Sequence, residues 1–159
     1  MIEILVVMVI IALAAGMLAI GFNIVVGQRL NSEVEKVAYW FESVSETAVF
    51  QASVLGVRAN EQGFDVVAFY DNRWFPFNEI ETFRLSGEFE RQIETEERID
   101  FGAEIDDREE DLEPFVAFLP SGQAIPPGSM SFFNDDQVPA VIRWDNSATF
   151  SLDGSEEGL

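Results

Sequence analysis

An uncharged apolar run near the N-terminus constrains this chain more than any other feature. The run covers residues 4–22, and all nineteen of its side chains are apolar or glycine. A helix of that length rises about 28 Å, close to the thickness of the hydrocarbon core of a bilayer. No Lys or Arg precedes the run and no Ala-x-Ala-like cleavage site follows it, unlike a cleaved signal peptide. The run therefore predicts a single retained membrane-spanning helix.

The helical pattern continues beyond this run as an amphipathic segment. Apolar side chains recur at steps of mostly three and four from residue 30 to residue 55, with polar side chains between them. Gly56 comes next, where a left-handed C-terminal cap is expected. We therefore expect one long helix, whose membrane part is residues 1–27 and whose amphipathic part is residues 28–56. The stripe expected to pack under the rest of the protein is Leu30, Val34, Val37, Phe41, Val44 and Ala48. Tyr39 and Trp40 lie off this stripe, where they are available for contacts with other molecules.

After Gly56 the pattern changes to short β-branched and aromatic runs separated by turn residues. GFDVVAFY (63–70), the turn DNR (71–73) and WFPF (74–77) together predict a hairpin, in which Pro76 indicates an edge strand. Further strands are predicted at 115–119, 123–125, 129–133, 138–145 and 148–154, with a Pro-Ser-Gly turn at 120–122. Strands this closely spaced indicate a small antiparallel β domain, here residues 57–159. Trp74 and Trp144 are expected to pack within it. The fold class is thus α+β, with one long N-terminal helix packed on an antiparallel sheet or sandwich.

The chain is strongly acidic, with 29 Asp and Glu against nine Lys and Arg and a net charge of −20. Such a surface repels nucleic acid and anionic lipid. Fifteen of the acidic residues fall in residues 78–113, where one or two exposed strands and a surface loop at 104–113 are predicted. The strand residues expected to point inward are Phe89, Gln92 or Ile93, Ile99 and Phe101.

Calcium binding by the loop is the alternative to simple solvation of its charges. The candidate oxygen ligands are Asp106, Asp107, Glu109, Glu110 and Asp111. They lack the D-x-D-x-D-G spacing of a preformed calcium loop, so a solvated loop is favoured and no metal site is predicted.

The chain contains no cysteine and no histidine. Disulfides, Cys/His metal sites, and Ser-His-Asp or Cys-His catalysis are therefore excluded. No Gly-rich phosphate loop is present either. We predict no catalytic residues, no cofactor and no enzymatic activity.

Two parts of the sequence resemble known families. IEILVVMVIIALAAGML resembles the start of mature type IV pilin-like proteins, which begin Phe-Thr-Leu-Ile-Glu, so that Ile2–Glu3 matches the Ile-Glu pair and Met1 stands at the third position. GFDVVAFYDNRWFPF and FVAFLPSGQAIP resemble segments of the H-type minor pseudopilins of type II secretion. The residues that match these motifs are Gly63, Trp74, Pro76, Leu119, Pro120, Ser121 and Gly122. The resemblance covers nearly the whole chain except the acidic variable region 78–113.

The resemblance implies a structural subunit of the periplasmic pseudopilus, in its tip region, which supports export of folded proteins. It implies a single-pass inner-membrane protein with a periplasmic globular domain. Its implied partners are other minor and major pseudopilins, the inner-membrane assembly platform, and the prepilin peptidase that processes and methylates the precursor. The alternative is a type IV pilus minor pilin, acting in assembly or DNA uptake. The lack of a basic patch and of cysteines favours secretion over that alternative.

Glu3 lies just before the apolar run, and two roles are considered for it. A carboxylate at a helix N-terminus interacts favourably with the helix dipole, by about 0.3–1 kcal/mol when exposed. The resemblance implies a second role in filament assembly, in which Glu3 pairs with the terminal amine of a neighbouring subunit in the apolar filament core. A carboxylate buried there requires such a partner. We favour the filament role.

Overall fold

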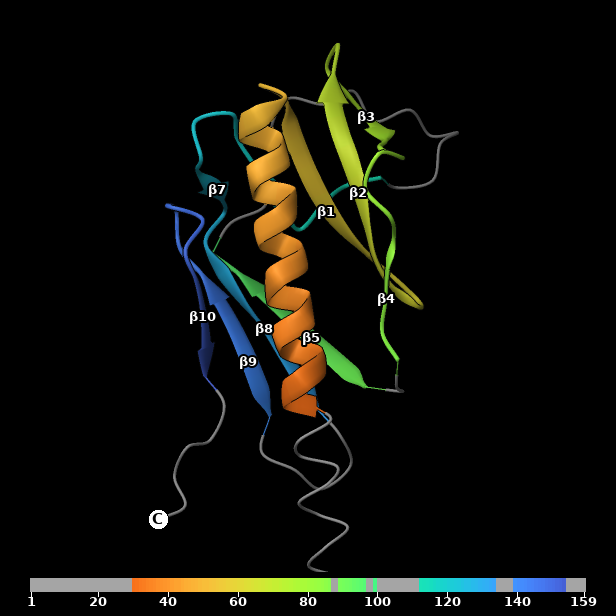
Figure 1. The fold of residues 1–159 in the computed structure, drawn as a ribbon. Coiled ribbons are helices and arrows are strands. Elements are labelled where there is room, and N and C mark those ends of the chain that lie inside the picture. The colour runs from red at the N-terminus through yellow and green to blue at the C-terminus, as the bar shows by residue number, and fades with distance from the viewer. Residues whose placement is uncertain (1–29, 87–88, 97–98, 100–111, 134–138, 154–159) are drawn as a thin grey trace, which may run out of the picture.

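The computed structural model describes residues 30–86, 89–96, 99, 112–133 and 139–153. This part of the chain forms one α-helix, whose described turns cover residues 30–50, followed by ten β-strands. The strands make two antiparallel sheets, and the helix runs along both of them (Figure 1). The α+β fold predicted from the sequence, one helix on antiparallel sheets, is confirmed.

The first sheet has six strands and holds most of the predicted hairpins. Its strands are β1 (Val54–Asn60), β2 (Gly63–Tyr70), β3 (Arg73–Pro76), β4 (Phe83–Arg84), β6 (Val116–Phe118) and β7 (Ala124–Ile125). The order is β3-β2-β1-β6-β7, and β4 pairs with the start of β2. Asp71 and Asn72 adopt left-handed backbone conformations in the β2–β3 turn, as a tight hairpin requires. Pro76 lies on the edge strand β3, as predicted.

The second sheet has four strands in the order β10-β9-β8-β5. They are β5 (Glu90–Thr95), β8 (Gly128–Phe133), β9 (Ala140–Trp144) and β10 (Phe150–Asp153). Along β5 every second residue is partly buried, so Ile93 points inward and Gln92 outward. Phe101 and the predicted loop at 104–113, except residues 112 and 113, lie outside the described residues.

The helix ends earlier than the sequence pattern predicts. Its last helical residue is at position 50, and Ala52 adopts a left-handed conformation with φ of 51°. The Ser53 N–H donates to the Ala48 carbonyl (3.1 Å) and the Ala52 N–H to the Val49 carbonyl (3.2 Å), which is a Schellman cap. The prediction that the helix continues to residue 55 is therefore wrong, because residues 54–60 form the strand β1.

Gly56 has a steric role instead of the predicted capping role. It lies in β1, paired with Val67 of β2 and Ala117 of β6. A Cβ atom added there would come within 2.6 Å of Pro114 Cγ and 2.9 Å of the Trp74 ring. Glycine is required because Pro114 and Trp74 cover the sheet at this point.

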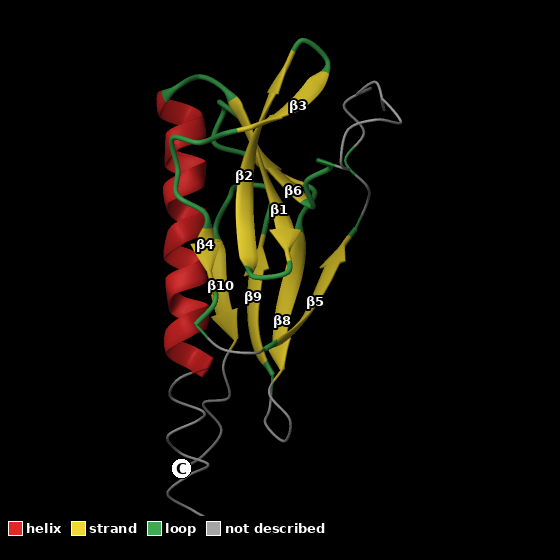
Figure 2. Ribbon diagram, turned by 90° about the vertical axis from the view of Figure 1, so that its right-hand side faces the viewer, coloured by secondary structure: helices red, strands yellow, loops and turns green. Residues whose placement is uncertain are grey.

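The main core consists of side chains from the helix and from both sheets. Figure 2 shows the helix beside the two sheets in side view. Phe41 lies at the centre of this core, with its ring 5.6 Å from that of Phe64 in β2 and 6.3 Å from that of Trp144 in β9. Both contacts are edge-on, the geometry that aromatic rings favour. The helix therefore joins the two sheets through one side chain that contacts both.

A smaller apolar cluster covers the other face of the first sheet. It consists of Val67, Trp74 and Ala117, and Ile99 and Leu112 pack against it. Ile99 and Leu112 belong to the acidic region of the sequence, so this region contributes apolar contacts to the domain as well as charge.

Candidate assembly site

The helix stripe predicted from the sequence lies in the core. All six of its residues are at most 3% exposed: Leu30, Val34, Val37, Phe41, Val44 and Ala48. The opposite helix face carries the exposed side chains of Glu35, Glu42 and Glu46. The stripe thus holds the helix rigidly against the domain and leaves an acidic face outward.

Glu33 is a buried carboxylate that the helical period assigns to the polar face. It is 6% exposed, and it accepts hydrogen bonds from Lys36 Nζ (2.7 Å) and the Ser86 backbone N–H (3.3 Å). Burial opposes its ionisation, but these hydrogen bonds and the Lys36 charge outweigh burial and lower the pKa of Glu33. Glu33 therefore anchors the segment after β4 to the helix. No sequence signal identifies this role, because Ser86 is 53 residues away.

Trp40 and Tyr39 differ in their surroundings, although both were expected to be available for contacts with other molecules. Trp40 is partly buried against the core, its ring lies 5.8 Å from that of Phe83, and its Nε1–H donates to the Glu81 carbonyl (3.2 Å). Tyr39 is 71% exposed. Trp40 is thus largely occupied within its own domain, whereas Tyr39 is available.

The seven motif residues lie at two ends of the first sheet. Trp74, Pro76 and the turn Leu119–Gly122 belong to the end where the helix terminates. In that turn the Gly122 N–H donates to the Leu119 carbonyl (2.9 Å), and Gly122 has φ of 80°, which glycine adopts without strain. Ser121, which follows Pro120, donates to Gln123 Oε1 (3.2 Å).

Gly63 is at the opposite end, at the start of β2. Its N–H donates to Asn60 Oδ1 (2.7 Å), and a Cβ atom there would collide with the Phe83 carbonyl of β4. Gly63 therefore permits β4 to pair with β2. Trp74 is 9% exposed and Trp144 is 3% exposed, so both tryptophans pack inside the domain.

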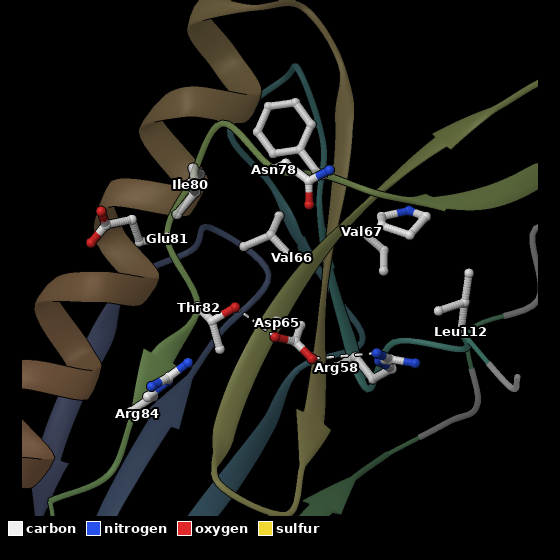
Figure 3. A pocket seen from close by; sticks show the side chains of 12 residues that line it. Arg58, Asp65, Val66, Val67, Asn78, Ile80, Glu81, Thr82, Arg84 and Leu112 are labelled. Atoms are coloured by element: carbon white, nitrogen blue, oxygen red, sulfur yellow. Dashed lines mark hydrogen bonds and ion pairs between the residues drawn. The ribbon is translucent and has the colours of Figure 1, made fainter.

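A polar network lines an open groove of about 710 Å³ beside β2 (Figure 3). Its centre is Asp65, which accepts hydrogen bonds from Asn60 Nδ2 (2.7 Å), Thr82 Oγ1 (2.9 Å) and Arg58 Nη2 (3.3 Å). Burial opposes ionisation, but these three donors together lower the pKa of Asp65. Through these three hydrogen bonds Asp65 ties β2 to β1 and to the segment before β4.

Arg91 of β5 connects the two sheets. Its guanidinium donates to the carbonyl oxygens of Gly63 (2.8 Å) and Asn60 (2.6 Å), and it lies 5.2 Å from the centre of the Phe64 ring. Burial lowers the pKa of Arg91. Arg91 lies in the acidic region of the sequence. No sequence pattern predicts its hydrogen bonds to Gly63 and Asn60.

The described part of the chain shows neither a metal-binding cluster nor a membrane-length helix. Within it, no three carboxylates are grouped so as to bind a metal ion. No helix in that part combines the length and the hydropathy that crossing a membrane requires. The predicted span at 4–22, Glu3 and the candidate calcium ligands at 106–111 lie outside the described residues.

The described part of the chain is thus an α+β fold, in which two antiparallel sheets cover the apolar stripe of a helix. The fold is similar to that of the minor pseudopilin EpsH from the type II secretion system of Vibrio cholerae. One crystal structure of EpsH matches with a TM-score of 0.62 and 17% identity, over 84% of this chain and 99% of that chain. A second EpsH structure matches with a TM-score of 0.60 and 17% identity, over 82% and 99%. No protein-family model and no curated protein matches the sequence.

Proposed function

We propose that this protein is a minor pseudopilin of a type II secretion system, a structural subunit without enzymatic activity. The observation that carries the proposal is the extent of the fold similarity, which covers 99% of the EpsH chain. The apolar run at residues 4–22 and the pilin-like Ile2–Glu3 pair support it from a different part of the chain.

In this proposal residues 4–22 anchor the chain once in the inner membrane, and the domain from residue 30 onward lies in the periplasm. The rigid attachment of the helix to the sheets suits this role. Phe41 contacts both sheets, so the described helix and the two sheets form one packed unit.

The proposed partners are other minor and major pseudopilins, contacted near the tip of the pseudopilus. The assembly platform of the inner membrane and the prepilin peptidase act on the precursor before incorporation. The assembled pseudopilus then supports the export of folded proteins.

A deletion strain tests the proposal. Loss of the gene should abolish secretion of a folded reporter into the medium, and the wild-type gene should restore it. The tagged protein should co-purify with other pseudopilins from detergent-solubilised membranes. Normal secretion after deletion, together with no co-purifying pseudopilin, would overturn the proposal.

DNA binding separates this proposal from a type IV pilus minor pilin that acts in DNA uptake. Binding to DNA depends on Lys and Arg that neutralise phosphates. Arg58 and Arg91 already bind within the domain, and the net charge of the chain is −20. The purified protein should therefore not retard DNA at about 0.15 M salt. Salt-sensitive binding would favour the pilin.

A further inference from the structure

Exposed apolar side chains gather at one end of the domain. Among the described residues, six large hydrophobic side chains are exposed, and four of them are near the end of the helix or on the β2–β3 hairpin. These four define the distal surface: Val49 (47% exposed), Phe50 (91%), Tyr70 (75%) and Phe75 (43%). The last helical turn and the β2–β3 turn lie at the same end of the molecule, opposite the end at which residue 30 enters (Figures 1 and 2).

The pairing of β2 with β3 places Tyr70 and Phe75 on one face of the hairpin. Phe75 is directly opposite Ala68, and Tyr70 is two residues beyond Ala68 on the same strand. Side chains two residues apart share a face, so all three point the same way. Ala68 packs against the main core, which identifies this face as the one turned toward the helix.

The helix ends before it covers this face. Its last helical residue is Phe50, and the hairpin extends past it in both views. Gln51 Nε2 donates to Glu79 Oε2 (2.7 Å), which ties the helix end to the segment that follows β3. The helix end is thus tied to the chain that leaves the hairpin, and the helix end and the hairpin both carry exposed aromatic side chains.

Phe50 and Tyr70 gain little stability from burial in the domain, whereas Val49 and Phe75 are about half buried. An aromatic residue that is 91% exposed gains almost nothing from the domain core, whereas exposed apolar patches mark interaction surfaces and aromatic anchors dominate their binding energy. Carboxylates border the distal surface, since the exposed Asp71 follows Tyr70 in the β2–β3 turn and Glu79 pairs with Gln51 at the helix end.

We infer that the distal surface binds the apolar N-terminal helix of a second pilin-like subunit. This inference rests on the proposed function. A neighbouring subunit of the same class brings a run like residues 4–22, which must be covered once it leaves lipid. Contact between two acidic domain surfaces is disfavoured by like charge, whereas an uncharged helix has no such penalty.

Site-specific photocrosslinking in the full-length protein in its own membranes tests the inference. A benzophenone amino acid is placed at position 50 or 70, and at Leu152 as a control. Leu152 is 46% exposed and lies on the outer strand β10 of the other sheet. Adducts from positions 50 and 70 should map by mass spectrometry to the apolar N-terminal helix of a pilin-like subunit. Position 152 should give none.

A double variant, Phe50→Ser with Tyr70→Ser, gives a second readout. It should lower the amount of co-purifying pilin-like subunit about tenfold, since loss of aromatic anchors costs more than 1 kcal/mol. Its unfolding midpoint should equal that of the wild type.

Adducts confined to lipid or to globular domains, or no adducts, would overturn the inference if the protein still co-purifies with other pseudopilins. In that case the proposed function stands. Absence of co-purification by the wild type would reject both.

Discussion

Arg91 of β5 donates a 2.6 Å hydrogen bond to the carbonyl oxygen of Asn60 at the end of β1. The two residues are 31 positions apart and belong to different sheets. A second bond from the same guanidinium, to the Gly63 carbonyl, completes a clamp on the β1–β2 turn. The two sheets therefore keep a fixed relation through polar contacts as well as through the shared core.

Replacing Arg91 should test this clamp. Arg91→Ala leaves two carbonyl groups without their charged donor and removes the contact with Phe64, so the free energy of unfolding should fall by about 2–3 kcal/mol. The free energy of unfolding of Arg91→Lys should lie between those of the wild type and Arg91→Ala, because an ammonium cannot reproduce the planar fork of a guanidinium. Denaturant unfolding monitored by tryptophan fluorescence measures both. Arg143→Ala is the control, since the ion pair of Arg143 with Asp153 is exposed on both sides and contributes at most about 1 kcal/mol. Equal effects of the two alanine variants would contradict the clamp.

Two phenylalanines of the same helix should respond oppositely to truncation. Phe41 is fully buried, and Phe41→Ala should lower the free energy of unfolding by about 3–5 kcal/mol through lost burial and a cavity. Phe50 is 91% exposed, and Phe50→Ala should change it by less than about 0.5 kcal/mol. Thermal unfolding followed by circular dichroism provides the comparison. A large loss of stability in Phe50→Ala would mean that Phe50 belongs to the core.

The helix cap offers a stabilising substitution. Ala52 has φ of 51°, a conformation that costs an L-residue with a Cβ about 1 kcal/mol and glycine little. Ala52→Gly should therefore raise the free energy of unfolding by a few tenths to about 1 kcal/mol, less the entropy that glycine adds to the unfolded chain. Ala48→Gly, inside the helix and buried, should lower it instead. If Ala52→Gly destabilises the protein as much as Ala48→Gly does, the left-handed cap is wrong.

Stability should fall in acid because of Asp65 and Glu33. Both pKa values are lowered in the folded protein, so the folded state binds a proton less readily than the unfolded state. The stabilisation is fully present above the unfolded pKa values of about 4, and it is lost as the pH falls through the folded values. Denaturation midpoints at pH 7 and pH 3 measure the loss. Asp65→Asn should show a smaller difference between the two pH values, and an unchanged difference would exclude Asp65 as a cause.

Glu3 remains a prediction from the sequence. In a full-length precursor, Glu3→Ala should leave membrane insertion intact, because it makes the start of the helix more apolar. It should weaken crosslinking to partner pseudopilins and secretion of a reporter, because a neighbouring amine loses its buried partner. Crosslinking and secretion of Glu3→Asp should lie between those of the wild type and Glu3→Ala, since the aspartate carboxylate reaches about one methylene less far. Normal crosslinking and secretion in Glu3→Ala would leave only the helix-dipole role.

The local pattern of the sequence determined much of the fold. The helical period placed Phe41 and five other side chains on one stripe, and all six are buried in the structure. The β2–β3 hairpin followed from the β-branched run and its Asp71–Asn72 turn. These features are local, since spacing along the chain decides which face a side chain occupies. Only part of the distal surface follows from the sequence. The helical period places Phe50 off the buried stripe, but the tertiary structure decides that the helix end and the β2–β3 hairpin lie at the same end of the domain.

Tertiary structure alone decided the rest. The apolar period runs on to Leu55, yet residues 54–60 form a strand, because pairing with β2 and β6 satisfies the backbone there and buries Leu55. Glu33 shares a sequence pattern with the exposed Glu35, but only Glu33 meets the backbone of Ser86. Arg84 and Arg91 form a similar contrast, because Arg84 is exposed whereas Arg91 donates to the backbone carbonyl of Gly63. Each of these contacts joins residues that are distant in sequence, and a charged side chain is stable in a buried position only where the fold supplies its partners.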